Sequence, residues 1–159
     1  MKDTNSNAYK AKGNFFRRIL KLPLMFMAWI APHAAFRTAC HKLRGIHIGK
    51  NVEIGYRVMI GNVHPENIYI GDNTTIAANS TILDHDNSYY YTSGGDVKFG
   101  KVVIGKNVFI GIGTVIMPGV KIGDGAIVGS LSFVNKDIPA YAVAAGNPVS
   151  IIKIRNIPS

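Results

Sequence analysis

The sequence predicts an all-β solenoid, a parallel β-helix of hexapeptide repeats, and three observations lead to this prediction. An aliphatic residue, usually followed by glycine, recurs every six positions along most of the segment from Ile48 to Val134, and a period of six is typical of parallel β-helices. The 17 glycines follow this period rather than the period of three that marks collagen. A chain of 159 residues with 47% apolar and 17% charged residues is one globular domain of ordinary size.

Each repeat is expected to supply one short strand and one corner, and three repeats close a triangular coil. The aliphatic residue points into the coil, and the small residue after it lets the chain turn at the corner without a Cβ clash. Because no coil can bury its own interior, stability must come from stacking on neighbouring coils.

Residues 1–45 form a basic, apolar N-terminal extension. They carry nine basic residues and one acidic residue, a net charge of +8, whereas the other 114 residues carry a net charge of +1. A nucleic-acid-binding surface should lie on the folded repeats, so this distribution argues against nucleic acid and favours an anionic membrane surface. The basic residues are Lys2, Lys10, Lys12, Arg17, Arg18, Lys21, Arg37, Lys42 and Arg44.

Within the extension we expect a disordered start at 1–13 and then one or two short helices. The uncharged stretch 22–36 has 15 residues and two prolines, whereas about 20 residues are needed to span a bilayer. The prolines also disfavour a secretory signal. One interpretation is a cytoplasmic protein in peripheral contact with the inner face of the cell membrane through residues 15–44, with Phe26 and Trp29 as anchors. The other is a cap over the open first coil, and the two are compatible.

The solenoid is expected over residues 46–136, with two interruptions. The spacing between inward positions widens from six to ten around His64 and to twenty-two over an extruded loop at 83–102. Insertions leave a solenoid as loops, and loops commonly carry function. A C-terminal cap is expected over 137–159, with a last strand or short helix at 149–155.

His85 opens the extruded loop directly after a repeat, flanked by Asp84 and Asp86. An imidazole titrates near neutrality, and a carboxylate on its second nitrogen fixes the tautomer, so this position suits a catalytic general base. Either aspartate can orient the ring. His64, in the corner bulge, is a weaker candidate for shaping an acceptor pocket.

A catalytic metal is not expected, because the histidines lack the spacing of a three-histidine zinc site. The histidine nearest to His85 in sequence is His64, 21 positions away. Cys40 is the one cysteine of the sequence, which excludes an intrachain disulfide and is compatible with a reducing compartment. Its place outside the solenoid disfavours a role as covalent nucleophile.

Three segments resemble the hexapeptide-repeat acyltransferases, and among them the O-acetyltransferases that act on sugars: IGDNTTIAANSTILDH, VVIGKNVFIGIGTVIMPGVKIGDGAIVGS and VNKDIPAYAVAAGNP. They lie within residues 70–148, a stretch of about half of the chain. The resemblance implies a left-handed β-helix, a homotrimer with sites between neighbouring prisms, and acetyl-CoA as co-substrate without a metal. The donor-binding positions that it implies are Ile112, Ser130, Asn135, Lys136 and Asn147.

The acceptor side departs from this family. Where the galactoside enzymes place an asparagine one coil before the base, the register of this chain gives Arg57, with Asn62 nearby. The run Tyr89-Tyr90-Tyr91 offers aromatic faces and hydroxyls to a sugar ring, or packs against an adjoining subunit.

The expected function is acetyl transfer from acetyl-CoA to a carbohydrate hydroxyl in the synthesis of a surface polysaccharide, capsule or O-antigen. The acceptor is expected to be lipid-linked. In a direct transfer His85 removes the hydroxyl proton, and a backbone N–H near the 110–113 turn stabilises the oxyanion. Two alternatives stay open: a small-molecule acetyltransferase acting on serine, an amino sugar or a drug, and a non-catalytic β-helix scaffold.

Overall fold

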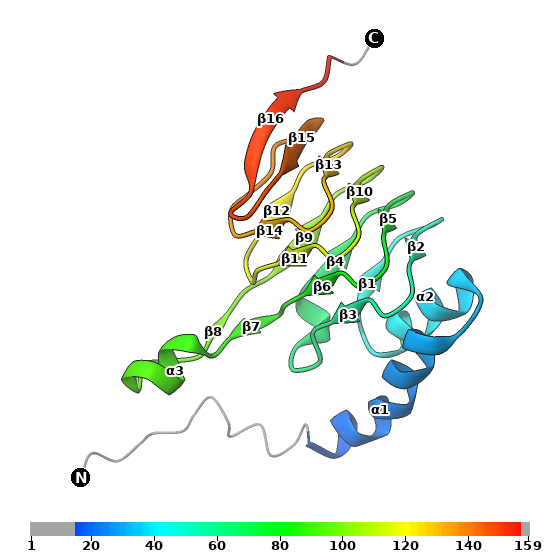
Figure 1. Ribbon diagram of the computed structural model, residues 1–159. Helices are drawn as coiled ribbons and strands as arrows, with labels where there is room; N and C mark the ends of the chain where they lie inside the picture. The colour runs from blue at the N-terminus through cyan, green and yellow to red at the C-terminus, as the bar shows by residue number, and fades with distance from the viewer. Residues whose placement is uncertain (1–14, 157–159) are drawn as a thin grey trace.

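The computed structural model describes residues 15–156, with side chains from residue 21 onward. It is a left-handed, three-sided parallel β-helix with two helices at its N-terminal end (Figure 1). The predicted fold class is thereby confirmed. The segment expected to be disordered, 1–13, lies outside the described residues.

Three sheets form the sides of the column, here named faces A, B and C in the order in which the chain meets them. Face A stacks β1 (His47–Ile48), β4 (Ile68–Ile70), β9 (Val102–Ile104) and β12 (Lys121–Ile122). Face B stacks β2 (Glu53–Ile54), β5 (Thr75–Ile76), β10 (Phe109–Ile110), β13 (Ile127–Val128), β15 (Ala142–Ala145) and β16 (Ser150–Ile154). Face C stacks β3 (Met59–Ile60), β6 (Thr81–Ile82), β11 (Val115–Ile116) and β14 (Phe133–Val134). The corner between faces B and C is the BC edge, and the corner between C and A is the CA edge.

In the two-residue strands of faces A, B and C, the second residue points into the column. On face B, for example, Ile54, Ile76, Ile110 and Val128 pair in register from coil to coil, and each is 0% exposed. Burial of one such side chain stabilises the fold by about 1.5–3 kcal/mol. Repeated on three faces, this interior supports a column whose individual coils have no core of their own.

Where a corner contains a residue in the left-handed backbone conformation, that residue lies three positions after the inward aliphatic residue and is not the glycine next to it. Asn51, Asn73 and Asn107 have φ angles of 53°, 56° and 54°, a conformation that asparagine tolerates. The adjacent glycine serves another purpose: a Cβ on Gly71 would lie 2.6 Å from the backbone of Gly105 in the next coil. The expected role of this glycine is therefore corrected, because it permits close stacking of coils rather than the turn.

The helices α1 (Phe15–Ile30) and α2 (Ala34–Leu43) close the open end of the column. In a later coil the carbonyl of an inward residue accepts an N–H from the preceding coil, as Ile76 O does from Gly55 at 2.8 Å. The first coil has no predecessor, and side chains of the cap take its place. Thr38 donates a hydrogen bond to Val52 O at 3.2 Å, Arg37 to Ile54 O at 2.7 Å and Arg44 to Ile60 O at 2.9 Å.

Covering the first coil is thus the structural role of the two helices of the extension. Of the two expected membrane anchors, Phe26 is 61% exposed, whereas the indole nitrogen of Trp29 is buried. Within residues 15–156, neither α1 nor any other helix has the length and apolar content needed to cross a bilayer.

Each of the two interruptions of the repeat forms a local structure of its own. The bulge around His64 contains a 3-10 turn, η2 (Pro65–Asn67). The loop expected at 83–102 is an ordered arm in which β7 (His85–Asp86) pairs antiparallel with β8 (Lys98–Phe99) and α3 (Ser88–Ser93) forms the tip. Figure 1 shows this arm leaving the column sideways.

The winding continues beyond residue 136, where the cap was expected to begin. Ile138 forms a bridge to Ile122 on face A, and β15 extends face B by pairing with β13. The chain then reverses, and β16 pairs antiparallel with β15. The segment 149–155 is therefore mainly a strand, and its reversed direction stops the addition of a further parallel coil.

Candidate active site

His85 lies where the chain leaves the CA edge for the arm. Its Nδ1 is 2.5 Å from Oδ1 of Asp84; the side chain of His85 is 25% exposed and that of Asp84 fully buried. The pairing of β7 with β8 sets Phe99 opposite His85, with 6.1 Å between the ring centroids. The imidazole is therefore held on one nitrogen by a buried carboxylate and flanked by the returning strand of the arm.

The corner bulge of the preceding coil holds the Asp84 carboxylate. Oδ2 of Asp84 accepts the backbone N–H of Val63 at 2.8 Å and that of His64 at 2.6 Å. Gly61 packs against the same group, since a Cβ on it would lie 2.6 Å from Asp84 Oδ1. The ten-residue spacing in the sequence thus marks a corner at which two amides bond to a carboxylate of the next coil instead of a backbone carbonyl.

Asp86 lies in a different environment. Its Oδ1 accepts the backbone N–H of Ser88 at 2.8 Å, at the start of α3, and this bond holds the pKa of Asp86 below its usual value. The sequence left Asp84 and Asp86 equivalent as partners of His85. The contact distances favour Asp84.

The arrangement of His85 and Asp84 suits proton transfer. With the Asp84 carboxylate ionised, Nδ1 of His85 carries the proton and donates it to Oδ1, so Nε2 has a free lone pair. Such a ring can take a proton from a hydroxyl, and the buried carboxylate then stabilises the imidazolium.

The residues expected to bind the donor lie on two different edges of one prism. Asn135 and Lys136 are exposed on the CA edge, two coils beyond His85, which is roughly 10 Å at the usual strand spacing. Ile112 and Ser130 are exposed on the BC edge, across the width of face C. A single chain therefore brings the first pair to the side of His85 but not the second.

The two remaining donor-side expectations concern turns. Asn147 is exposed in the turn between β15 and β16. In the 110–113 turn, the amides of Gly111 and Gly113 donate to Val128 O at 2.8 Å and Ala78 O at 3.0 Å. These two amides are engaged in coil stacking and are not available to an oxyanion.

The expected acceptor-side residues are also dispersed. Arg57 occupies the BC edge of the first coil, where its backbone N–H donates to Trp29 O at 3.4 Å. Asn62 is exposed on the CA edge, one coil before His85.

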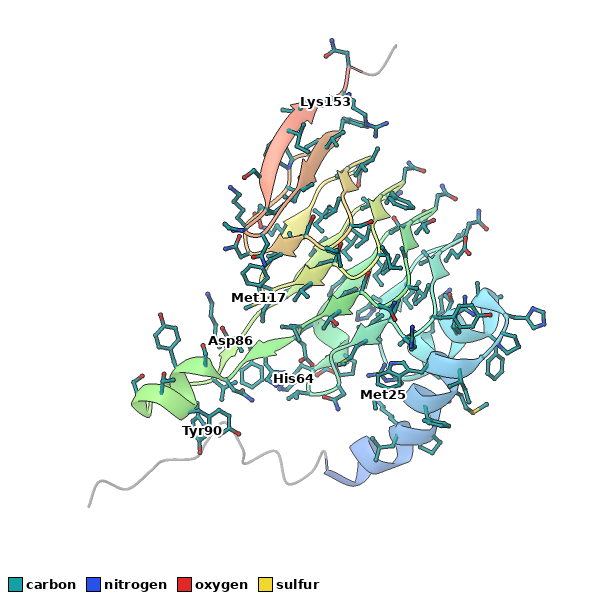
Figure 2. The ribbon with its side chains drawn as sticks, viewed as in Figure 1. Met25, His64, Asp86, Tyr90, Met117 and Lys153 are labelled. Atoms are coloured by element: carbon teal, nitrogen blue, oxygen red, sulfur yellow. The ribbon has the colours of Figure 1, made fainter. Side chains whose placement is uncertain are left out.

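Tyr89 and Tyr90 belong to α3 and are 67% and 38% exposed. Figure 2 shows Tyr90 at the far end of the arm, away from the column, with Asp86 nearer to its base and His64 beside the bulge. The tip of the arm is thus free to meet another molecule.

Other reactive groups of the described residues do not form a second site. No group of three or more His, Cys, Asp or Glu side chains with a metal-binding arrangement occurs among them. Cys40 is 2% exposed, and burial raises the pKa of its thiol, which leaves the thiol protonated and unreactive.

Two family models match the chain. The model "Bacterial transferase hexapeptide (six repeats)" matches residues 101–136, and "Hexapeptide repeat of succinyl-transferase" matches residues 45–84. Galactoside O-acetyltransferase of Escherichia coli (strain K12) is 38% identical over 128 residues, which are 79% of this chain and 60% of that protein. The chain spans about three fifths of the length of the first curated relatives that it matches.

Solved structures resemble this one over most of its length. A galactoside acetyltransferase in complex with coenzyme A superimposes with a TM-score of 0.69 at 28% identity, covering 93% of this chain and 85% of the other. A maltose O-acetyltransferase from Clostridium difficile 630 gives a TM-score of 0.70 at 25% identity, covering 91% of this chain and 90% of the other.

Proposed function

Because this chain belongs to the hexapeptide-repeat acyltransferases, we propose that it transfers an acetyl group from acetyl-CoA to a carbohydrate hydroxyl. The observation that carries the proposal is the 2.5 Å contact between His85 Nδ1 and the buried carboxylate of Asp84. The galactoside and maltose enzymes among the similar proteins support a sugar as acceptor.

In this reaction His85 moves one proton. Acetyl-CoA supplies a thioester whose carbonyl carbon is the acyl donor. His85 Nε2 takes the proton of the acceptor hydroxyl while the hydroxyl oxygen bonds to that carbon, and Asp84 balances the charge of the imidazolium. As the carbon–sulfur bond breaks, His85 returns the proton to the departing sulfur, so the ring ends in its starting state.

The exposed residues of the CA edge fit the donor. Lys136 offers a cation to a phosphate group of CoA, and Asn135 offers an amide beside it. Asn147 lies at the same end of the column and is equally exposed. These side chains hold the nucleotide end, while the extended pantetheine arm lies along the coils.

The site is completed by a second copy of the chain in a homotrimer. In such an assembly the BC edge of one subunit, with Ile112 and Ser130, faces the CA edge of the next, with His85. The apolar character of the BC edge supports this contact, since Ile112 is 46% and Leu131 75% exposed in the single chain. Arg57 lies on the BC edge and Asn62 on the CA edge, so in the trimer both border the groove between two subunits. There they are available to the acceptor, together with Tyr89 and Tyr90 of the arm.

We further propose a lipid-linked acceptor, such as a capsule or O-antigen unit, at the inner face of the membrane. Leu22, Phe26 and Ile30 follow one another at four-residue intervals on α1, and they are 48%, 61% and 59% exposed. Such spacing forms a single apolar stripe on a helix. Residues 1–45 carry a net charge of +8; Arg37 and Arg44 are buried in the cap, and the other basic residues would attract anionic lipid to this stripe.

Membrane contact is tested by replacing two residues of the stripe, Phe26→Ser with Ile30→Ser. Both are exposed, so the fold should persist while co-sedimentation with phosphatidylglycerol vesicles falls. Phe109→Ser, which removes a 46% exposed ring from face B, is the matched control and should bind vesicles as the wild type does. Undiminished sedimentation of the double variant would remove the membrane proposal. Truncation is unsuitable here, because α2 closes the first coil.

Catalysis is tested with His85→Ala. We expect kcat/KM for acetyl transfer to a sugar panel to fall by about 10²–10⁴, while the thermal shift caused by CoA is unchanged. His47→Ala, which removes an imidazole stacked on Tyr69 of face A, should retain full activity. Full activity of His85→Ala would refute the assignment of the base.

The same assay separates the alternative functions. A panel with serine, an amino sugar and chloramphenicol beside galactosides and maltose identifies a small-molecule enzyme by its preferred acceptor. A scaffold would show no rise in melting temperature with CoA, because only a ligand that binds the folded state raises it.

A further inference from the structure

Arg44 directly follows α2 and buries its guanidinium beneath the corner that holds the catalytic pair. It is 2% exposed and bonds to neutral acceptors: Nη2 to Ile60 O at 2.9 Å and Gly61 O at 3.3 Å, and Nη1 to His41 Nδ1 at 2.9 Å. Among the side chains that the structure describes, no carboxylate lies within salt-bridge distance of it. A buried charge in this situation requires compensation from further away.

The compensating charge is Asp84, on the other side of Gly61. The Gly61 carbonyl accepts from Arg44, and the space where a Gly61 side chain would begin is 2.6 Å from Asp84 Oδ1. Asp84 is itself fully buried, and its backbone donors from Val63 and His64 are neutral. Burial lowers the pKa of Arg44, and the charge of Asp84 counteracts this effect. The two buried ions therefore interact across one peptide group.

We propose that Arg44 is a positioning residue for the His85–Asp84 pair. It fixes the carbonyls of Ile60 and Gly61 and, across that peptide, favours the ionised carboxylate that orients His85. The N-terminal extension thereby supplies part of the active site. This inference deepens the proposed acetyl-transfer function and rests on it for its kinetic consequence.

The consequence is a defined direction of pH dependence. The form of the pair that acts as base has Asp84 ionised and His85 neutral, a net charge of −1, and adding one proton brings the net charge to zero. A nearby cation stabilises the first form relative to the second, so loss of Arg44 moves protonation of the pair to higher pH. The other charged or titratable groups around the pair are Asp86 and Lys98 of the arm, His64 and Glu66 of the bulge, Lys21 of α1 and His41 of α2.

The test compares Arg44→Gln, which removes the charge but keeps a donor, with Arg44→Lys, which keeps the charge. Arg37→Gln is the matched control, because Arg37 of α2 is also a buried arginine of the N-terminal cap but donates to Ile54 O on face B. Two readouts are used: the midpoint of the His85 ring titration by NMR, and the acid limb of the pH profile of kcat/KM.

We expect Arg44→Gln to move both midpoints upward by on the order of one pH unit, so that kcat/KM falls about tenfold at acid pH and recovers at alkaline pH. Arg44→Lys should keep both midpoints at their wild-type values. Arg37→Gln should lower the melting temperature without moving either midpoint. A purely structural role of Arg44 would instead lower activity at every pH.

An unchanged midpoint in Arg44→Gln, or an equal shift in Arg37→Gln, overturns the proposal. Should Arg44→Gln not fold, Arg44→Lys decides: a wild-type midpoint with reduced kcat supports the role of the charge, and a displaced midpoint overturns it. A shifted NMR midpoint in a protein without acetyl-transfer activity would leave the Arg44 assignment intact and refute the proposed function.

Discussion

At the scale of single residues, burial distinguishes two carboxylates that look equivalent in the sequence. Asp84 and Asp86 flank His85 symmetrically, yet Asp84 is fully buried against the bulge, whereas Asp86 bonds to the start of α3. The position of the proposed base could be identified from the place where the repeat breaks. Its partner could not, because the direction of a side chain at that point depends on how the arm leaves the corner.

His41 is a second buried imidazole, with consequences for stability. It is 0% exposed, its Nδ1 faces Arg44, and its Nε2 has no hydrogen-bond partner in the described structure. Burial, and then the charge of Arg44, lower the pKa of His41 to about 3. The folded protein therefore holds this ring neutral at a pH where the unfolded chain protonates it.

Lowering the pH should consequently destabilise the protein already at pH values well above those at which its carboxyl groups take up protons. The unfolded chain binds a proton at His41 near its ordinary pKa of 6.5, and the folded chain does so only near 3. This contribution to stability is fully present above pH 6.5 and is lost as the pH falls. Between pH 7 and 5 we expect a loss on the order of 2 kcal/mol in the free energy of unfolding. His41→Gln keeps an acceptor for Arg44 but cannot titrate, so it should lose less.

Urea denaturation at pH 7 and pH 5 measures this difference. Glu66, Asp72 and Asp86 have lowered pKa values from ordinary values of 4.5, 3.8 and 3.8, so their contributions are lost only at lower pH. Equal pH dependence of wild type and His41→Gln would contradict a buried neutral imidazole.

At the scale of the element, the corner glycines meet two different requirements, space for the next coil and a left-handed backbone conformation. The two kinds of glycine look alike in the sequence. Gly71 is needed for space, because a Cβ would meet the backbone of the next coil at 2.6 Å. Gly119 is needed for conformation, because its φ is +85° and nothing lies within 4 Å of an added Cβ.

The two requirements predict different costs for the same substitution. Gly71→Ala should destabilise by about 1–3 kcal/mol or more, as overpacking against backbone does. Gly119→Ala should cost about 1–2 kcal/mol, the price of the left-handed conformation alone. Thermal unfolding of the two variants measures this, and Gly71→Ala proving the milder one would contradict the assignment of space and conformation.

The N-terminal cap is a second element whose existence, but not whose chemistry, could be predicted. An open first coil requires a cover, and the apolar segment before it was an evident candidate. That Arg37, Thr38 and Arg44 would each meet a carbonyl of that coil follows from the alignment of α2 with the strands. The same three residues look like ordinary polar positions of an amphipathic helix in the sequence.

At the scale of the whole molecule, the CA edge, which carries His85, and the BC edge, where the pantetheine arm is expected to bind, are separated by face C. The proposed trimer joins them, and Leu131 is the residue whose conformation points most directly to such a contact. Its φ is 58° and it is 75% exposed, an unfavourable state for leucine in a corner position where the two preceding coils use Asn79 and Gly113.

Replacing Leu131 by asparagine should therefore relieve the backbone and remove the contact together. We expect the Leu131→Asn chain to remain folded while its mass in solution falls from that of a trimer and acetyl transfer declines. Light scattering after size exclusion, combined with the activity assay, measures both. A trimer of full activity would show that this edge does not form the interface.

The period of six determined the column without further information, because it fixes which residue of every repeat is buried and where each corner falls. The three segments that resemble the hexapeptide-repeat acyltransferases likewise indicated the family. Only the tertiary structure decided what surrounds His85: the amides of Val63 and His64 lie 21 and 20 positions before Asp84, and Arg44 directly follows a helix outside the repeat. Such contacts depend on how coils stack and on the direction in which insertions leave them, and neither is encoded in the local periodicity of the chain.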